Sequence, residues 1–178
     1  MLSWLVERRH RKRTAQNLYG SIVAQTRKPA FYGELGVPDT VEGRFELLVL
    51  HVFLVLDGLR GAGAKGEVLA QQLVDIFITD MDTTMRELGV GDMAVAKRMR
   101  SLADVFCERL ADYREALSES GDKALKQSLR EHLQSSASPD DALTGALANY
   151  VLGTKQALEN LPSERLEAGE LKFYDIAA

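Results

Sequence analysis

The stretch FELLVLHVFLVL at residues 45–56 decides the fold. Ten of its twelve residues are apolar, and only Glu46 and His51 interrupt it. A helix that is apolar on all sides is buried either in a bundle or in a membrane. The charged residues just before the stretch leave it well short of the roughly 20 apolar residues that a bilayer requires. Residues 40–60 are therefore predicted to form the central, buried helix of a helical bundle.

Apolar residues recur at spacings of three and four on both sides of this stretch, as amphipathic helices require. Such helices are predicted at residues 3–27, 67–88, 92–117, 122–134 and 139–160. The alternating pattern typical of strands is absent from the 178 residues, and a chain of this length is expected to form one core. The sequence therefore predicts an all-α fold, a single bundle of about six helices.

Two connections stand out between the predicted helices. Residues 28–39 (KPAFYGELGVPD) contain two prolines, two glycines and two adjacent aromatic residues, which is typical of a structured turn region. Asp39 and Glu42 have the spacing of a capping box, so Asp39 is predicted to cap the central helix. Residues 61–66 (GAGAKG) predict a flexible connection to the next helix.

Charge is distributed unevenly along the chain. Residues 1–28 hold seven Lys or Arg against one acid, a net charge of +6, whereas the remainder carries −10. We therefore expect a basic amphipathic segment at residues 1–16, a helical domain at residues 17–160 and a C-terminal tail at residues 161–178. A basic segment attracts an anionic membrane or RNA, although a solvated tail is an equally ordinary interpretation.

An apolar start followed by basic residues suits a helix that lies at a bilayer interface. The residues predicted to contact a membrane or a partner in this segment are Trp4, Arg8, Arg9, Arg11, Lys12 and Arg13. Lys97, Arg98 and Arg100 form a second basic cluster, which is either solvated or a contact for a partner or a membrane.

Residues with catalytic or metal-binding potential are few. Glu7 and His10 form a single E-x-x-H, but the paired motifs that di-iron bundles use are absent, and His51 is predicted to be a hydrogen-bonded core residue. Asp80 and Asp82 lie about 200° apart on a helix and are interpreted as solvated charges. Cys107 is the single cysteine, so no intramolecular disulfide can form. We predict no catalytic residue, no metal site and no cofactor.

Four methionines cluster around the predicted turn at residues 89–92: Met81, Met85, Met93 and Met99. Methionine fills irregular gaps in cores, and it also lines surfaces that accept varied apolar partners. Core packing is the ordinary interpretation of this cluster. Exposure of at least two of the four would instead favour a groove for an apolar peptide.

Three separated stretches carry a resemblance to a known family. They are LYGSIVAQTRKPAFYGELGVPDTVEGRFELLVLH at residues 18–51, DMDTTMRELGVGDMAVAKRM at residues 80–99 and FCERLADY at residues 106–113. Together they resemble the ubiquinol-cytochrome c chaperone family. The resemblance spans about residues 17–117, so it covers more than half of the chain.

The resemblance implies a non-enzymatic assembly factor for respiratory complex III that binds newly made cytochrome b. Mitochondrial family members work near the ribosomal exit with a small partner subunit, so a ribosome contact is possible, whereas DNA is not expected. The location implied is peripheral at the inner membrane, on the cytoplasmic side in a bacterium or the matrix side in a eukaryote.

We expect the client surface to combine the turn region with the methionine-rich turn, because glycine and proline there make burial of the backbone unfavourable. The predicted client-binding residues are Phe31, Tyr32, Val37, Met81, Met85, Val90, Met93 and Met99. Two other classes stay open. An RNA- or ribosome-binding module would show one continuous basic face, and a bundle enzyme would show a deep polar pocket with convergent acids.

Overall fold

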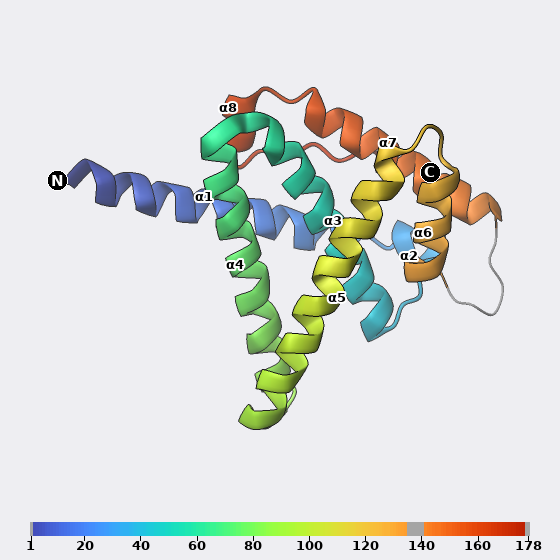
Figure 1. The fold of residues 1–178 in the computed structure, drawn as a ribbon, viewed down its shortest axis with the longest axis horizontal. Coiled ribbons are helices and arrows are strands. Elements are labelled where there is room, and N and C mark those ends of the chain that lie inside the picture. Colours follow the sequence, from blue (N-terminus) through green and yellow to red (C-terminus); the bar gives the residue numbers. More distant parts are fainter. Residues whose placement is uncertain (1, 135–140, 177–178) are drawn as a thin grey trace.

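Helix α3 (Val41–Leu59) lies at the centre of the molecule (Figure 1). The computed structural model describes residues 2–134 and 141–176, and only the backbone of residues 2–6. Within this part α3 packs against α1, α4, α5, α6 and α7. Ten of its residues are buried, among them His51 and Phe53. The prediction of a buried central helix is confirmed, with boundaries one residue inside the predicted ones at each end.

The helices around α3 are α1 (Leu2–Thr26), α4 (Gly63–Glu87), α5 (Asp92–Ser118), α6 (Lys123–Leu133) and α7 (Asp141–Glu159). Three short elements join them: α2 (Ala30–Gly33), the 3-10 helix η1 (Arg60–Ala62) and α8 (Ser163–Glu167). The described residues contain no strand. The predicted all-α bundle of about six helices is confirmed, while the predicted start of the last long helix, at residues 139 and 140, lies outside the described residues.

Two parts of the molecule project from the body (Figure 1). The N-terminal end of α1 extends on the left of the view, and the hairpin of α4 and α5 reaches the bottom. The rest of the bundle lies above and to the right of the line that joins these two ends. The α4–α5 turn is closed by backbone hydrogen bonds, including one from Val90 N–H to the Met85 carbonyl oxygen at 3.1 Å.

By length and hydropathy alone, the stretch Val41–Glu87 contains a window apolar enough to cross a membrane, and half of that window is buried. The core helix of a bundle gives the same signal, because it is apolar on all sides. Since α3 supplies the centre of the core, its hydropathy is explained by packing.

The connection after α3 differs from the predicted flexible one. The chain continues through η1 directly into α4, which begins at Gly63 with a φ of 62°. Gly66 is buried, and a Cβ atom there would lie 2.2 Å from the Leu59 carbonyl oxygen. The glycines therefore permit a tight, regular helical corner in which backbone approaches backbone.

The start of α3 is capped by Thr40 and not by Asp39 as predicted. The Thr40 Oγ1 accepts a hydrogen bond from Gly43 N–H at 3.1 Å. Asp39 instead accepts from Arg44 Nε at 2.6 Å. Thr40 has the extended backbone conformation that an N-cap needs, so the hydroxyl one position further along takes the capping role.

Gly43→Ala is expected to destabilise the protein, because a Cβ at this buried position would lie 2.1 Å from the Pro38 carbonyl oxygen. Overpacking of this kind costs about 1–3 kcal/mol. Gly20→Ala is the matched control, since a Cβ at Gly20 meets nothing within 4 Å and α1 should gain about 0.5–1 kcal/mol. Urea melts of the two variants should shift in opposite directions. Equal shifts would show that the start of α3 relaxes freely.

The C-terminal segment folds back onto the helices. After α8, the Phe173 ring lies 5.6 Å from the His51 ring, and Tyr174 N–H donates to Thr154 Oγ1 at 3.1 Å. The Tyr174 ring covers Gly153, where a Cβ would approach it to 2.5 Å. Residues 168–176, hereafter the C-terminal strap, therefore cover the buried histidine between α3 and α7.

Candidate functional site

The candidate site is an apolar groove of about 620 Å³ between the end of α1, the start of α3, the end of α4 and the middle of α5. Its apolar lining includes Val23, Phe45, Leu48, Met81, Met85 and Leu102. Val41 and Leu88 also line it and are 75% and 73% exposed. A groove whose lining is mostly hydrocarbon and whose edge exposes aliphatic side chains fits an apolar ligand.

The floor of the groove is supported by stacked aromatic rings. Phe45, in the first turns of α3, stacks on Phe77 of α4 with ring centroids 6.4 Å apart. Phe77 is fully buried and packs in turn against Phe106 of α5 at 4.9 Å. Because α3 is apolar from Phe45 onward, its first turns leave apolar side chains half-buried where the neighbouring helices do not cover them. Packed aromatic rings therefore lie beneath the groove.

A polar edge borders the groove at α2. The Tyr32 O–H donates to the Thr26 carbonyl oxygen at 2.7 Å, and the Arg44 guanidinium lies 5.2 Å from the Tyr32 ring centroid. Burial raises the pKa of the Tyr32 hydroxyl, although the charge of Arg44 opposes the shift. The Tyr32 ring is thus held in place from two sides and lines the groove.

Three predicted client-binding residues line this groove: Tyr32, Met81 and Met85. Met93 lies elsewhere, 90% exposed at the start of α5. Val90 and Met99 are half-buried. Only one of the four clustered methionines is exposed. Exposure of at least two of them would have favoured a peptide groove built by the methionines, so the cluster itself does not support one. The groove owes most of its lining to the first turns of α3 and to the end of α4.

The expectation that Phe31 and Val37 are exposed is wrong, since they are 0% and 2% exposed. The turn region contains α2, which inserts Phe31 edge-on between His51, at 5.2 Å, and Tyr150, at 5.0 Å. Val37 N–H donates to the Phe31 carbonyl oxygen at 3.0 Å, which folds the loop onto the core. Both residues stabilise the fold and do not belong to a surface.

A buried hydrogen-bonded chain crosses the core beside Phe31. Gln25 Nε2 donates to Tyr150 Oη at 3.0 Å, and the Tyr150 O–H donates to His51 Nε2 at 2.8 Å. His51 Nδ1–H donates to the Leu47 carbonyl oxygen, also at 2.8 Å. Burial lowers the pKa of His51 to about 4 and raises that of Tyr150 to about 12. His51 is therefore a neutral, hydrogen-bonded core residue, as predicted.

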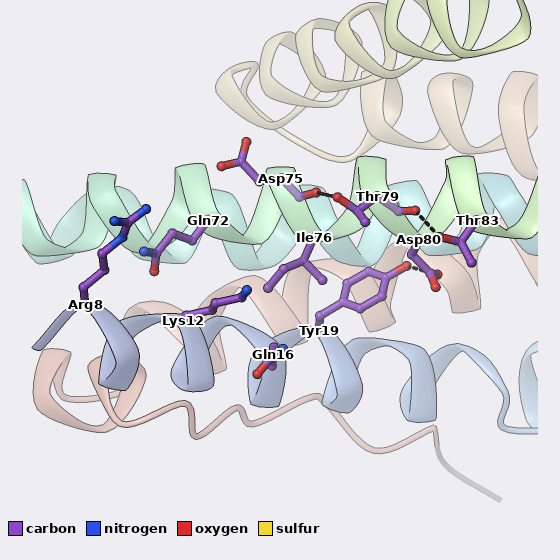
Figure 2. A pocket seen from close by; sticks show the side chains of 10 residues that line it. All are labelled: Arg8, Lys12, Gln16, Tyr19, Gln72, Asp75, Ile76, Thr79, Asp80 and Thr83. Carbon is purple, nitrogen blue, oxygen red and sulfur yellow. Dashed lines mark hydrogen bonds between the residues drawn. The ribbon is translucent and has the colours of Figure 1, made fainter. Parts of the chain in front are cut away.

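A second, polar groove of about 570 Å³ lies between α1 and α4 (Figure 2). The Tyr19 O–H donates to Asp80 Oδ2 at 2.6 Å, and burial together with this bond raises the pKa of Tyr19. Arg8 and Lys12 line the same groove from α1, and Arg8 reaches toward α4 (Figure 2). Two residues predicted to contact a membrane therefore also face a neighbouring helix.

The other basic residues of α1 differ in exposure. Arg9 and Arg13 are exposed, whereas Arg11 is half-buried and pairs with Glu7 at 3.0 Å. The Trp4 side chain lies outside the described residues. In the second basic cluster, Lys97, Arg98 and Arg100 are all exposed.

Among the residues that the structure describes, no group of three or more His, Cys, Asp or Glu side chains is placed to hold a metal ion. The residues missed by sequence reasoning are the remaining apolar members of the groove. Phe45 and Leu48 were visible as part of the apolar stretch, but Val23 and Leu102 carry no signal that separates them from ordinary core positions.

The whole-chain comparison decides the family. The family model described as ubiquinol-cytochrome C chaperone matches residues 33–173, which include α3, α4, α5 and most of the C-terminal strap but not α1. The chain belongs to the ubiquinol-cytochrome C chaperone family. The fold of this chaperone-family chain is also that of a crystal structure of the Cbp3 homolog from Brucella abortus. The two are 34% identical with a TM-score of 0.86, over 99% of this chain and 98% of the other.

Animal relatives are more distant. The chain is 24% identical to ubiquinol-cytochrome-c reductase complex assembly factor 1 of Xenopus laevis over 155 residues, 87% of this chain and 77% of the relative. It is 25% identical to the assembly factor 1 of Mus musculus over 163 residues, 91% of this chain and 55% of the relative. The chaperone-family chain thus spans about half the length of the mouse protein.

Proposed function

We propose that this protein is a non-enzymatic assembly chaperone for ubiquinol-cytochrome c reductase, respiratory complex III. In this proposal the client is newly made cytochrome b, and the apolar groove binds one hydrophobic segment of that client. The family membership and the names of the relatives support the assembly role. The observation that carries the proposed site is the apolar groove itself, with Val41 and Leu88 exposed along it.

The chemistry of the groove suits this task. Burying a Leu or Phe side chain of a client removes apolar surface from water and contributes about 1.5–3 kcal/mol. A few such side chains suffice for reversible binding, because much of the gain is offset by the entropy cost of association. No cofactor is needed for this kind of recognition. A release step requires only that the client find a larger apolar surface in the complex it joins.

The two alternative classes lack comparable support. The N-terminal end of α1 and the start of α5 lie at different extremities in Figure 1, so the two basic segments do not form one continuous face for RNA. The groove is lined mainly by apolar side chains instead of convergent acids, which an enzyme pocket would show. A chaperone therefore fits the described surfaces better than an RNA-binding module or a bundle enzyme.

The proposed location is peripheral, on the cytoplasmic side of the inner membrane in a bacterium or the matrix side in a mitochondrion. The exposed Arg9 and Arg13 support contact of the N-terminal segment with an anionic membrane. Charges near such a surface contribute roughly 1 kcal/mol each. A contact with the ribosome remains a prediction from the family resemblance.

Site-specific photo-crosslinking tests the proposed client site. A crosslinking amino acid at Val41, 75% exposed at the groove, should capture cytochrome b synthesised in the presence of the protein and membranes. Val68 is the matched control, because it is also an exposed valine, at 45%, on a helix but does not line the groove. Capture at both positions, or of lipid alone at Val41, would contradict the proposed site.

Met85→Glu should weaken client capture at least about tenfold, because the half-buried side chain lines the groove and a carboxylate is costly to bury without a partner. The yield of the Val41 crosslink reports the effect. Circular dichroism melts of the same variant separate loss of binding from loss of folding. An unchanged yield in a folded variant would place the client elsewhere.

A further inference from the structure

The turn between α4 and α5 exposes two large apolar side chains at the projecting end of the molecule. Leu88, directly after α4, is 73% exposed, and Met93, in the first turn of α5, is 90% exposed. Single exposed apolar residues are ordinary on protein surfaces. Both, however, lie at the turn that joins α4 to α5, and this end of the hairpin lies beyond the rest of the bundle in Figure 1. Residues 88–100 are called the hairpin tip below.

Basic side chains follow the exposed apolar ones. Lys97, Arg98 and Arg100 are exposed, and none takes part in an ion pair in the described part of the chain. Met93, Lys97 and Arg100 follow one another at spacings of four and three, which places them on one face of α5. This face is opposite the one that buries Val95, which is 0% exposed.

Nearby acids offset this cluster only in part: Glu87 is exposed beside Leu88, but two other acids are paired. Asp82 and Asp92 are both engaged by Arg86, which donates to Asp82 Oδ2 at 2.6 Å and also pairs with Asp92. Residues 86–100 hold four basic and two acidic side chains, whereas the chain as a whole has a net charge of −4. The hairpin tip is thus a locally positive, apolar-ended projection on an acidic protein.

We propose that the hairpin tip docks onto an anionic lipid bilayer. Leu88 and Met93 enter the boundary between headgroups and acyl chains, while Lys97 and Arg100 contact lipid phosphates and Arg98, on the flank of α5, adds to the local positive charge. Apolar side chains flanked by basic ones are the combination by which peripheral segments bind anionic membranes. This contact can be tested without cytochrome b, because it involves lipid, although Leu88 belongs both to the hairpin tip and to the proposed client groove.

The shape of the molecule permits this docking together with the N-terminal segment. In Figure 1 the body lies on one side of the line from the N-terminal end of α1 to the hairpin tip, so one flat surface can touch both. Leu88 also lines the apolar groove. Docking of the hairpin tip therefore places that groove next to the bilayer.

An environment-sensitive fluorophore at the tip tests the proposal in the full-length protein. Met93→Cys is labelled with a nitrobenzoxadiazole in a Cys107→Ser background, because Cys107 is exposed and would otherwise react. Vesicles of phosphatidylglycerol and phosphatidylcholine should shift the emission to the blue and raise it several-fold, and pure phosphatidylcholine should not. The same label at Val68→Cys, 45% exposed on α4, should stay unchanged.

Charge removal gives the second readout. Lys97→Gln, Arg98→Gln and Arg100→Gln combined should weaken binding of the full chain to anionic vesicles by on the order of 100-fold at low salt, about fivefold per charge. The matched control combines Arg114→Gln, Lys123→Gln and Lys172→Gln, which removes three exposed charges away from the tip and should weaken binding much less.

Three outcomes would overturn the proposal. The label at position 93 could stay in water while the protein sediments with vesicles, which would leave the N-terminal segment as the sole contact. The two triple variants could bind anionic vesicles equally well, which would show that binding depends on the net charge of the protein and not on the hairpin tip. The label could respond to a single-stranded RNA oligonucleotide and not to vesicles, which would assign the tip to nucleic acid.

Discussion

Phe53→Ala will lower the free energy of unfolding by about 3–5 kcal/mol. Phe53 is 2% exposed at the middle of α3, and its ring lies 5.5 Å from that of Tyr113 in α5. Truncation removes the apolar surface that the ring buries and leaves a cavity, because α5 and its neighbours are held by their own contacts and cannot collapse fully. Against a typical domain stability of about 5–15 kcal/mol, the loss is large.

Urea denaturation followed by circular dichroism measures this loss. Phe53→Leu is the control, because a smaller change in volume at the same apolar site should cost less than about 1.5 kcal/mol. A loss below about 1 kcal/mol for Phe53→Ala would mean that the centre of the bundle repacks easily, and the description of α3 as the core helix would then be wrong.

Mild acid will destabilise the protein through His51. The folded-state pKa is about 4 because the ring is buried, whereas an unfolded histidine has a pKa of about 6.5. Between these values the unfolded chain binds the extra proton, so stability is full above pH 6.5 and falls as the pH drops toward 4. The expected loss is about 2 kcal/mol between pH 7 and pH 5 and about 3 kcal/mol over the whole window.

His51→Gln isolates this contribution. Glutamine does not titrate, while the carboxylates elsewhere in the chain titrate equally in both proteins. The free energy of unfolding should therefore fall more steeply for the wild-type chain than for His51→Gln between pH 7 and pH 5. Parallel slopes would show that the buried ring takes up a proton without cost, contrary to its closed environment between Phe31, Tyr150 and Phe173.

The bundle was predictable because its signals are local. The apolar run of α3 and the three-and-four spacing of the other helices lie within single elements, and glycine or proline marks most ends. The turn region shows the limit of such signals. Its glycines and prolines indicated an exposed loop, yet Phe31 fills a gap between α3 and α7 that exists only in the folded bundle.

The candidate groove was predictable only in part for the same reason. Met81 and Met85 were identified by clustering, and Tyr32 by its place in the turn region. The groove itself lies where the ends of α1, α3 and α4 meet the middle of α5. That arrangement depends on crossing angles set by packing along the full length of each helix. Val23 and Leu102 follow the same spacing as buried residues, so their periodicity could not show which of them would face the groove.

The C-terminal strap bears on the order in which the chain folds. The Phe173 ring packs against the His51 ring, although the two residues are far apart in the sequence. Tyr174 N–H donates a hydrogen bond to Thr154 Oγ1 on α7. Its docking surface exists only after α3 and α7 have met, since each supplies one side of it. The strap must therefore dock late, because non-local contacts form after the local helices that receive them. Until it docks, the polar chain through His51 stays open to water on that side, so release of the strap alone would expose the core histidine without unfolding the helices.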